Sequence, residues 1–142
     1  MKFNTYLNFF AKTEEAFNFY KSVLGGEFSS FVRFKDFPIP GVTIPEAEQN
    51  LIMHIALSVG DNMLMGTDAL ASMGHTLTVG NNVNISIHPD SKEEADRLFA
   101  GLSVGGKVEM PIADQVWGDY YGAFEDKYGI RWMINYHDPN KK

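Results

Sequence analysis

Residues 3–10 alternate in a way that is typical of a β-strand, with every second side chain on the same face. One face of this segment carries Phe3, Thr5, Leu7 and Phe9, and the other carries Asn4, Tyr6, Asn8 and Phe10. The period then changes to that of an amphipathic helix, with Ala16, Phe19, Tyr20, Val23 and Leu24 at helical spacing. Thr13 suits the N-cap of this helix, and Gly25-Gly26 suits its end. The pattern predicts a strand followed by a helix.

Three further strands are predicted in the first half of the chain. Residues 27–34 form the first of them, and residues 35–49, which contain three prolines, predict a long extended loop. Residues 51–59 and 62–67 then predict a hairpin that turns at Gly60 and Asp61.

The second half repeats this plan. Residues 82–88 alternate like a strand, and Ser91 with Glu94 predicts a capping box at the start of a helix. The apolar stripe of that helix consists of Ala95, Leu98, Phe99 and Leu102. The two helical segments, EEAFNFYKSVLGGEF and EEADRLFAGLSVGGKV, differ in length by one residue, which indicates an internal repeat.

Residues 116–135 predict the last hairpin of the repeat. Aromatic and apolar residues flank a polar turn at residues 125–129. This stretch holds both tryptophans, Trp117 and Trp132, and three of the six tyrosines. We therefore expect it to line whatever cavity the protein has.

The repeat predicts an α+β fold of two tandem βαβββ modules within one domain, residues 1–142. Module 1 covers residues 1–67, a connector covers residues 68–81, and module 2 covers residues 82–138. Neither module can bury its own sheet face alone. We expect the two sheets to form a curved wall, or incomplete barrel, whose concave face encloses a pocket, with the helices outside.

Composition narrows the classes of function. The chain has 142 residues, a net charge of −6 and no cysteine. The absence of cysteine excludes disulfides and thiolate chemistry, and the absence of a Lys/Arg cluster argues against a nucleic-acid partner. No apolar run approaches the roughly 20 residues that span a bilayer. With no secretory signal at the N-terminus, we expect a cytoplasmic protein with no membrane partner.

Four features of the sequence together resemble one known group. They are the paired strand-helix-three-strand plan, the phrase EEAFNFYKSVLGGE, the run HIALSVGDNMLMGTD, and VWGDYYGAFEDKYGIRWMIN. These are similar to PhnB-like proteins of the vicinal oxygen chelate superfamily, which includes glyoxalase I, extradiol dioxygenases and bleomycin-resistance proteins. The resemblance covers nearly the whole chain. It implies the fold, and it implies a homodimer, since related proteins commonly pair through these sheets.

The resemblance also implies where a metal would bind. The four ligand positions of the metal-dependent enzymes fall on Thr5, near Met65, on Asn84 and on Met133. None of these residues offers an imidazole or a carboxylate, so we predict no metal site and no cofactor. A hydroxyl, an amide and two thioethers suit an organic ligand better.

Other residues are candidates for contact with that ligand. His54 is a candidate acid/base group or ligand contact, or else a hydrogen-bonded histidine in a sheet. Trp117 can stack on an aromatic ligand or fill the core, and Arg131 can anchor a carboxylate or enolate unless it faces solvent. Asn84 lines the pocket or faces water. Met65 and Met133 line it or pack in the core.

The leading hypothesis is a metal-free binder of a small hydrophobic or planar metabolite or xenobiotic. Two alternatives stay open: a metal-dependent lyase, isomerase or dioxygenase whose ligands have moved to include His54, or a dimerising module with a vestigial cavity. The sequence does not decide whether the protein is an enzyme.

Overall fold

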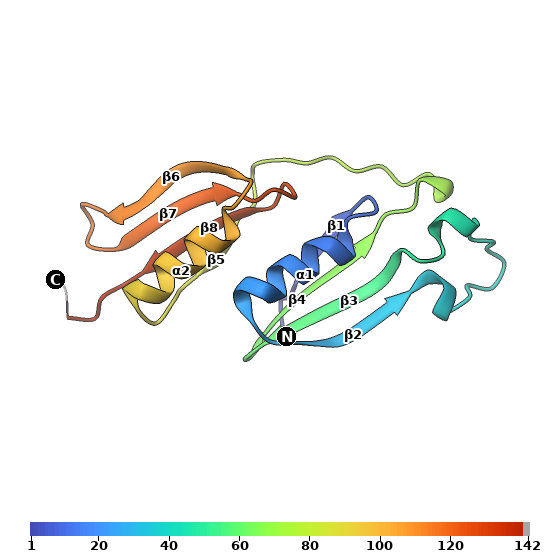
Figure 1. Ribbon diagram of the computed structural model, residues 1–142, viewed down its shortest axis with the longest axis horizontal. Helices are drawn as coiled ribbons and strands as arrows, with labels where there is room; N and C mark the ends of the chain where they lie inside the picture. The colour runs from blue at the N-terminus through green and yellow to red at the C-terminus, as the bar shows by residue number, and fades with distance from the viewer. Residues whose placement is uncertain (141–142) are drawn as a thin grey trace. The chain divides into compact units, whose positions relative to one another are not determined.

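The computed structural model describes residues 1–140 and contains two compact units, Met1–Thr78 (unit 1) and Val79–Lys142 (unit 2). Each unit has one helix and one four-stranded mixed sheet (Figure 1). The predicted α+β class and the duplicated strand-helix-three-strand plan are therefore confirmed. No helix within residues 1–140 is long and apolar enough to cross a membrane.

Unit 1 contains β1 (Thr5–Phe9), α1 (Thr13–Leu24), β2 (Glu27–Arg33), β3 (Ile52–Val59) and β4 (Asn62–Asp68). The strand order is β1-β4-β3-β2. β1 runs parallel to β4, while β4 and β2 are antiparallel to β3. Short 3-10 turns, Phe34–Asp36, Glu46–Glu48 and Ala71–Met73, lie in the two long connections.

Unit 2 contains β5 (Ile85–Ile87), α2 (Lys92–Leu102), β6 (Lys107–Asp114), β7 (Tyr120–Glu125) and β8 (Arg131–Tyr136). Its strand order, β5-β8-β7-β6, repeats that of unit 1, with the first strand parallel to the last. The predicted strand at residues 82–88 is shorter in the structure, because Asn82, Val83 and Asn84 lie before β5. The last hairpin begins at Tyr120, so Trp117 lies in the loop between β6 and β7.

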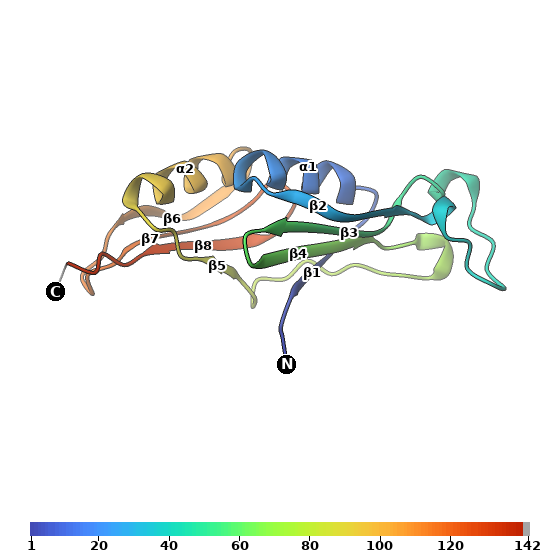
Figure 2. The same cartoon turned by 90° about the horizontal axis from the view of Figure 1, so that it is seen from below.

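In each unit the helix covers one face of its own sheet (Figure 2). α1 buries Ala16, Phe17 and Tyr20, and Phe17 lies so close to β4 that a Cβ on Gly66 would come within 2.6 Å of its ring. In α2, Phe99 packs edge-on against Phe124, with ring centroids 5.0 Å apart. A Cβ on Gly122 would come within 2.6 Å of the Phe99 ring. A glycine thus lets the helix approach each sheet.

One prediction about α1 is wrong. Lys12, not Thr13, occupies the N-cap, and no side chain caps the helix from within. Asp68 at the end of β4 does this instead, because one of its oxygens accepts hydrogen bonds from the Thr13 amide (3.1 Å) and hydroxyl (2.7 Å). Its other oxygen accepts from the Ile52 amide at 2.8 Å. The predicted cap at Ser91 of α2 is confirmed, with Glu94 donating its amide to the serine hydroxyl.

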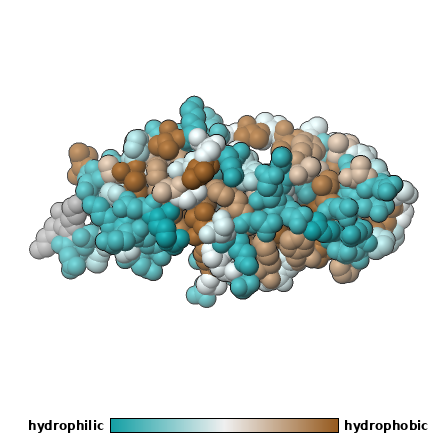
Figure 3. Space-filling view, viewed as in Figure 1, coloured by the Kyte–Doolittle hydropathy of each residue, from teal (hydrophilic) through white to brown (hydrophobic). Residues whose placement is uncertain are grey.

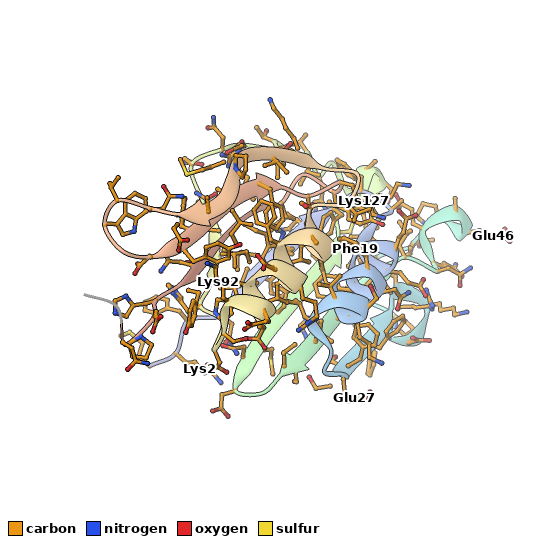
Figure 4. All side chains as sticks on the ribbon, turned by 60° about the vertical axis from the view of Figure 1, so that its left-hand side comes forward. Lys2, Phe19, Glu27, Glu46, Lys92 and Lys127 are labelled. Carbon is orange, nitrogen blue, oxygen red and sulfur yellow. The ribbon has the colours of Figure 1, made fainter. Side chains whose placement is uncertain are left out.

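The surface mixes hydrophilic residues with hydrophobic patches (Figure 3). Charged side chains of α2 also pack on their own sheet: Lys92, labelled at the start of α2 in Figure 4, lies 4.5 Å from the centre of the Tyr120 ring. It pairs with Asp114 at 3.3 Å.

Candidate functional site

The sheet of unit 1 has one face against α1 and one face without a helix, here called the open face of unit 1. Leu7, Ile55 and Gly66 are in register with one another across β1, β4 and β3. Since Gly66 abuts Phe17, this row faces α1. The neighbouring row of Tyr6, Met65 and Ala56 therefore faces the other way, because successive side chains alternate across a sheet. Asn8, His54 and Thr67 share the open face by the same alternation.

Tyr6 and His54 form a hydrogen-bonded pair on the open face. The Tyr6 hydroxyl lies 2.9 Å from Nδ1 of His54, and the two ring centroids are 5.7 Å apart. Burial raises the pKa of the Tyr6 phenol above its usual value of 10.0, so the hydroxyl keeps its proton at neutral pH. His54 is half-buried, and Tyr6 is 43% exposed. The pair is accessible to a ligand.

A cavity of about 560 Å³ also lies in unit 1. Asn8 and Thr67, which follow Tyr6 and Met65 along their strands, form part of its wall. Its apolar lining comes from Phe34, Ile39, Met53, Ala69, Leu70, Met73 and Leu77. Asp68, His75 and Thr76 complete it. A mainly apolar cavity with a few polar groups is the usual form of a small-molecule site.

Two hydrogen-bonded contacts hold the walls of the cavity. The Glu48 carboxylate accepts from the amide and hydroxyl of Ser72, which ties the proline-containing loop to the segment after β4. Nδ1 of His75 accepts from the Leu70 amide at 2.9 Å. Thr67 is also engaged, donating its hydroxyl to the Met53 carbonyl at 2.8 Å. Asn8 is exposed at the rim, where its amide is available to a ligand.

The sheet of unit 2 likewise has an open face, opposite α2. Met133 lies there beside Ala123 and Ser86, with which it is in register. Arg131, two residues away on the same face, has both terminal nitrogens bound by the Glu109 carboxylate. This fork is the geometry that would hold a ligand carboxylate. Glu109 therefore already occupies Arg131, the residue that the sequence suggested as an anchor for a ligand carboxylate.

Asp119 forms a second polar cluster on unit 2. Its carboxylate accepts from the Asn135 amide at 3.0 Å and lies 2.6 Å from Nδ1 of His137. The hydrogen bond from His137, followed by that from Asn135, holds the pKa of Asp119 below its usual value. Trp117 is 59% exposed nearby and packs edge-on against Tyr121, with ring centroids 5.9 Å apart.

The predicted ligand-binding residues do not all share a face. Met65 and His54 lie on the open face of unit 1, and Met133 and Arg131 lie on that of unit 2. Thr5 lies on the α1 side with Leu7, and Asn84 is exposed ahead of β5. Sequence reasoning missed Tyr6. The alternation contained the signal, because Tyr6 falls between two asparagines on the face opposite the apolar Phe3, Leu7 and Phe9.

Comparison with known proteins identifies the family of this chain. A profile of the Glyoxalase/Bleomycin resistance protein/Dioxygenase superfamily matches residues 2–134. The chain belongs to this superfamily. Among solved structures, the superfamily fold recurs in the protein PA1353 from Pseudomonas aeruginosa, which is 34% identical, with 96% of this chain and 98% of that one covered and a TM-score of 0.86.

Two other relatives cover the superfamily domain almost completely. A PhnB protein from Bacillus cereus is 27% identical over 96% of this chain and 99% of its own, with a TM-score of 0.76. Protein YjdN of Escherichia coli K12 is 27% identical over 95% of both chains. The resemblance to PhnB-like proteins is thereby confirmed.

The metal chemistry of the superfamily can be tested against the side chains present. The central open-face positions hold Tyr6 in register with Met65 in unit 1, and Ser86 in register with Met133 in unit 2. In each unit this is one hydroxyl and one thioether, which are poor donors for a hard or borderline divalent ion. Within residues 1–140, no three His, Asp or Glu side chains gather at a spacing suited to a metal. The donor set does not fit the metal site of the superfamily enzymes.

Proposed function

We propose that this chain is a PhnB-like member of the superfamily that binds a small, planar, mainly apolar molecule without a metal ion. The observation that carries the proposal is the cavity of unit 1, which joins the open face at Asn8 and Thr67. Its volume of about 560 Å³ falls in the range of ordinary ligand pockets. Methionine is an adaptable contact for a flat ring, and Met53 and Met73 line the cavity, while Met65 lies on the open face.

The position of the polar groups supports an oriented ligand. Asn8 offers an amide at the rim, and His54 offers an imidazole next to Met65. A few convergent polar groups in an apolar setting fix the orientation of a ligand and supply specificity. Metal independence is supported by the central open-face residues of each unit, a hydroxyl and a thioether, since neither is an imidazole or a carboxylate of the kind that binds the metal in the superfamily's metal-dependent enzymes.

Ligand binding is tested by titrating bicyclic aromatic compounds, such as naphthalene, quinoline and indane, by calorimetry and thermal shift. Binding to the folded state raises the melting temperature. Ala69→Phe places a ring in the cavity wall and should lower affinity at least about tenfold. Ala47→Phe, at an exposed position in the Glu46–Glu48 turn, is the matched control and should leave affinity unchanged.

A chelator separates this proposal from the metal-dependent alternative. Affinity that is unchanged by excess EDTA agrees with the proposed binder. Binding that disappears with EDTA and returns with a divalent ion would contradict it, and silence across the panel would favour a vestigial cavity.

We also propose that two copies associate. β2 and β6 are edge strands that carry exposed apolar side chains, with Phe31 at 37% and Val108 at 44% exposure. Unpaired edges of this kind favour association with another chain. Light scattering coupled to size exclusion measures the mass, and a monomer at 15.9 kDa under all concentrations would reject the dimer.

A further inference from the structure

The hydrogen bond between Tyr6 and His54 determines which nitrogen of the imidazole carries the proton. A neutral imidazole has one N–H donor and one acceptor nitrogen, and the hydrogen bond at one nitrogen fixes the role of the other. The Tyr6 hydroxyl lies 2.9 Å from Nδ1 and is protonated at neutral pH, since burial raises its pKa further above the ordinary value of 10.0.

Two proton arrangements are available to the pair. If Nδ1 carried the proton, it would donate to the phenolic oxygen, and the Tyr6 O–H would be left to find another acceptor. If Nδ1 is the acceptor, the Tyr6 O–H is satisfied at once. A phenolic O–H is a stronger acid than the N–H of a neutral imidazole, and an imidazole nitrogen is a better acceptor than a phenolic oxygen, so the second arrangement is favoured. His54 then carries its proton on Nε2.

The Nε2–H group is presented on the open face of unit 1. The open-face positions of β1, β3 and β4 hold Tyr6, Asn8, His54, Ala56, Ser58, Met63, Met65 and Thr67, and none is a carboxylate. Within residues 1–140, no hydrogen-bond partner occupies Nε2. Met65 and Ala56 on the same face are apolar, and Asn8 and Thr67 of that face line the cavity. A flat ligand that extends from the cavity over the open face would reach this donor. An acceptor atom on that ligand would satisfy it.

We propose that His54 selects ligands bearing an acceptor oxygen, such as a ketone, quinone or lactam carbonyl, and that Tyr6 is the positioning residue that fixes its tautomer. This inference rests on the proposed function and names the chemical class of ligand. A planar hydrocarbon of the same size would fill the same space but leave Nε2–H unpaired. A donor that is left unpaired when a ligand excludes water costs binding free energy. The carbonyl compound therefore binds more tightly than the hydrocarbon.

The tautomer is measurable without any ligand. In ¹⁵N-labelled protein, the imidazole nitrogen shifts of His54 at neutral pH should show a protonated Nε2 and an unprotonated Nδ1. Tyr6→Phe removes the donor to Nδ1 and should move both shifts toward a mixture of tautomers. Tyr128→Phe, in the β7–β8 turn, is the control and should leave them unchanged. A protonated Nδ1 in the unsubstituted protein would overturn the inference.

The ligand class is tested with 1-indanone and indane, which share a ring system and differ by one carbonyl. We expect 1-indanone to bind about tenfold more tightly to the unsubstituted protein. His54→Phe should abolish this preference while still binding indane. His54→Gln, which keeps an N–H donor, should restore part of it, and Tyr6→Phe should reduce it.

The outcomes separate the two proposals. Equal affinity for the two compounds would overturn the role of His54 and leave the proposed function intact. Preference that survives His54→Phe would also overturn it. If neither compound binds, nor any other bicyclic compound, the proposed function fails and the inference fails with it.

Discussion

The two units share a strand order but differ in how their open faces treat polar side chains. On unit 2 the polar groups are bound to each other: Glu109 pairs with Arg131, and the Asp119 carboxylate is hydrogen-bonded to Asn135 and His137. The open face of unit 1 carries no carboxylate or guanidinium, and Asn8 and, as proposed, Nε2 of His54 are available to a ligand. The cavity also lies in unit 1.

If unit 1 binds the ligand as proposed, the two units of the duplicated scaffold have different roles. The central open-face residues of the two units are similar, a hydroxyl in register with a methionine in each: Tyr6 with Met65, and Ser86 with Met133. What differs is the surrounding set of partners. A surface whose hydrogen-bond donors are already paired with other side chains offers nothing to a ligand, whereas a surface with an unpaired donor does. This distinction depends more on the neighbouring side chains than on the strand residue itself.

Replacing a buried carboxylate is expected to have the largest effect on either unit. Asp68 joins α1 and β3, and we expect Asp68→Ala to lower the free energy of unfolding by at least about 3 kcal/mol, because three donors lose a charged acceptor. Urea denaturation measures this loss. Asp61→Ala, at the exposed β3–β4 turn, is the control. A loss below about 1 kcal/mol would show that the carboxylate is not needed.

Unit 2 should respond in the same way at Asp126. Its oxygens accept from the amides of Tyr128 and Ile130 and from the indole of Trp132 at 2.8 Å. Because these partners lie in a single hairpin, Asp126→Ala should destabilise unit 2 without altering ligand affinity in unit 1. A change in that affinity would contradict the separation of tasks.

The two close-approach glycines should differ in their tolerance of a methyl group. Gly122→Ala should cost about 2–3 kcal/mol, because the new Cβ meets the backbone of Ile112 at 2.8 Å as well as Phe99. Gly66→Ala should cost about 1–2 kcal/mol, since its nearest contact is a side chain, Phe17. Thermal and urea unfolding measure both losses.

A double variant sharpens this prediction. Phe17→Leu removes the ring that Gly66→Ala meets, so the two changes together should cost less than their sum. Gly80→Ala, whose nearest neighbour would lie at 3.6 Å, is the control. Strict additivity would mean that Phe17 is not the obstacle.

Releasing Arg131 should make unit 2 more like a binding surface. Glu109→Gln removes the bound carboxylate and should raise affinity for benzoate roughly tenfold, because the guanidinium fork becomes available to another anion. Isothermal titration measures this gain. Adding Arg131→Met should abolish it, and a gain that persists in the double variant would locate benzoate elsewhere.

The smallest expected effect is an alkaline change in stability at Tyr120. Its hydroxyl donates to Asp96, which raises the phenol pKa from 10.0 to about 12. A raised pKa in the folded state contributes stability that is complete below pH 10 and is lost as the pH rises toward about 12. Tyr120→Phe should reduce the fall of the melting temperature with pH over that interval. An unchanged pH profile would contradict the assignment.

Much of the fold was predictable because the local patterns agree with the final pairing. The hairpin around Gly60 and Asp61 and the N-cap at Ser91 each depend on neighbours in the sequence. Asp68 was not predictable as the cap of α1, because its partner Thr13 lies on a distant segment. β5 was overestimated, since Asn82 and Asn84 alternate like a strand but have no partner in β8.

The candidate site was predictable only in part. His54 and Met65 were named, yet Thr5 was placed on the open face by resemblance when the polar alternation pointed to Tyr6. A shift of one residue moves a side chain to the opposite face of a sheet. The engagement of Arg131 by Glu109 also lay beyond sequence reasoning, because the irregular register between β6 and β7 decides it.

The parallel pairing of β1 with β4 also dictates an order of assembly. Thr5 has no ladder partner until Leu64 has been synthesised, and Ile85 must wait in the same way for Trp132. During translation β1 and β5 therefore have no hydrogen-bonded strand partner at a stage when the helix that follows each of them can already form. A ribosome that pauses within β3 would leave β1, with Leu7 and Phe9, exposed to solvent and without a strand partner.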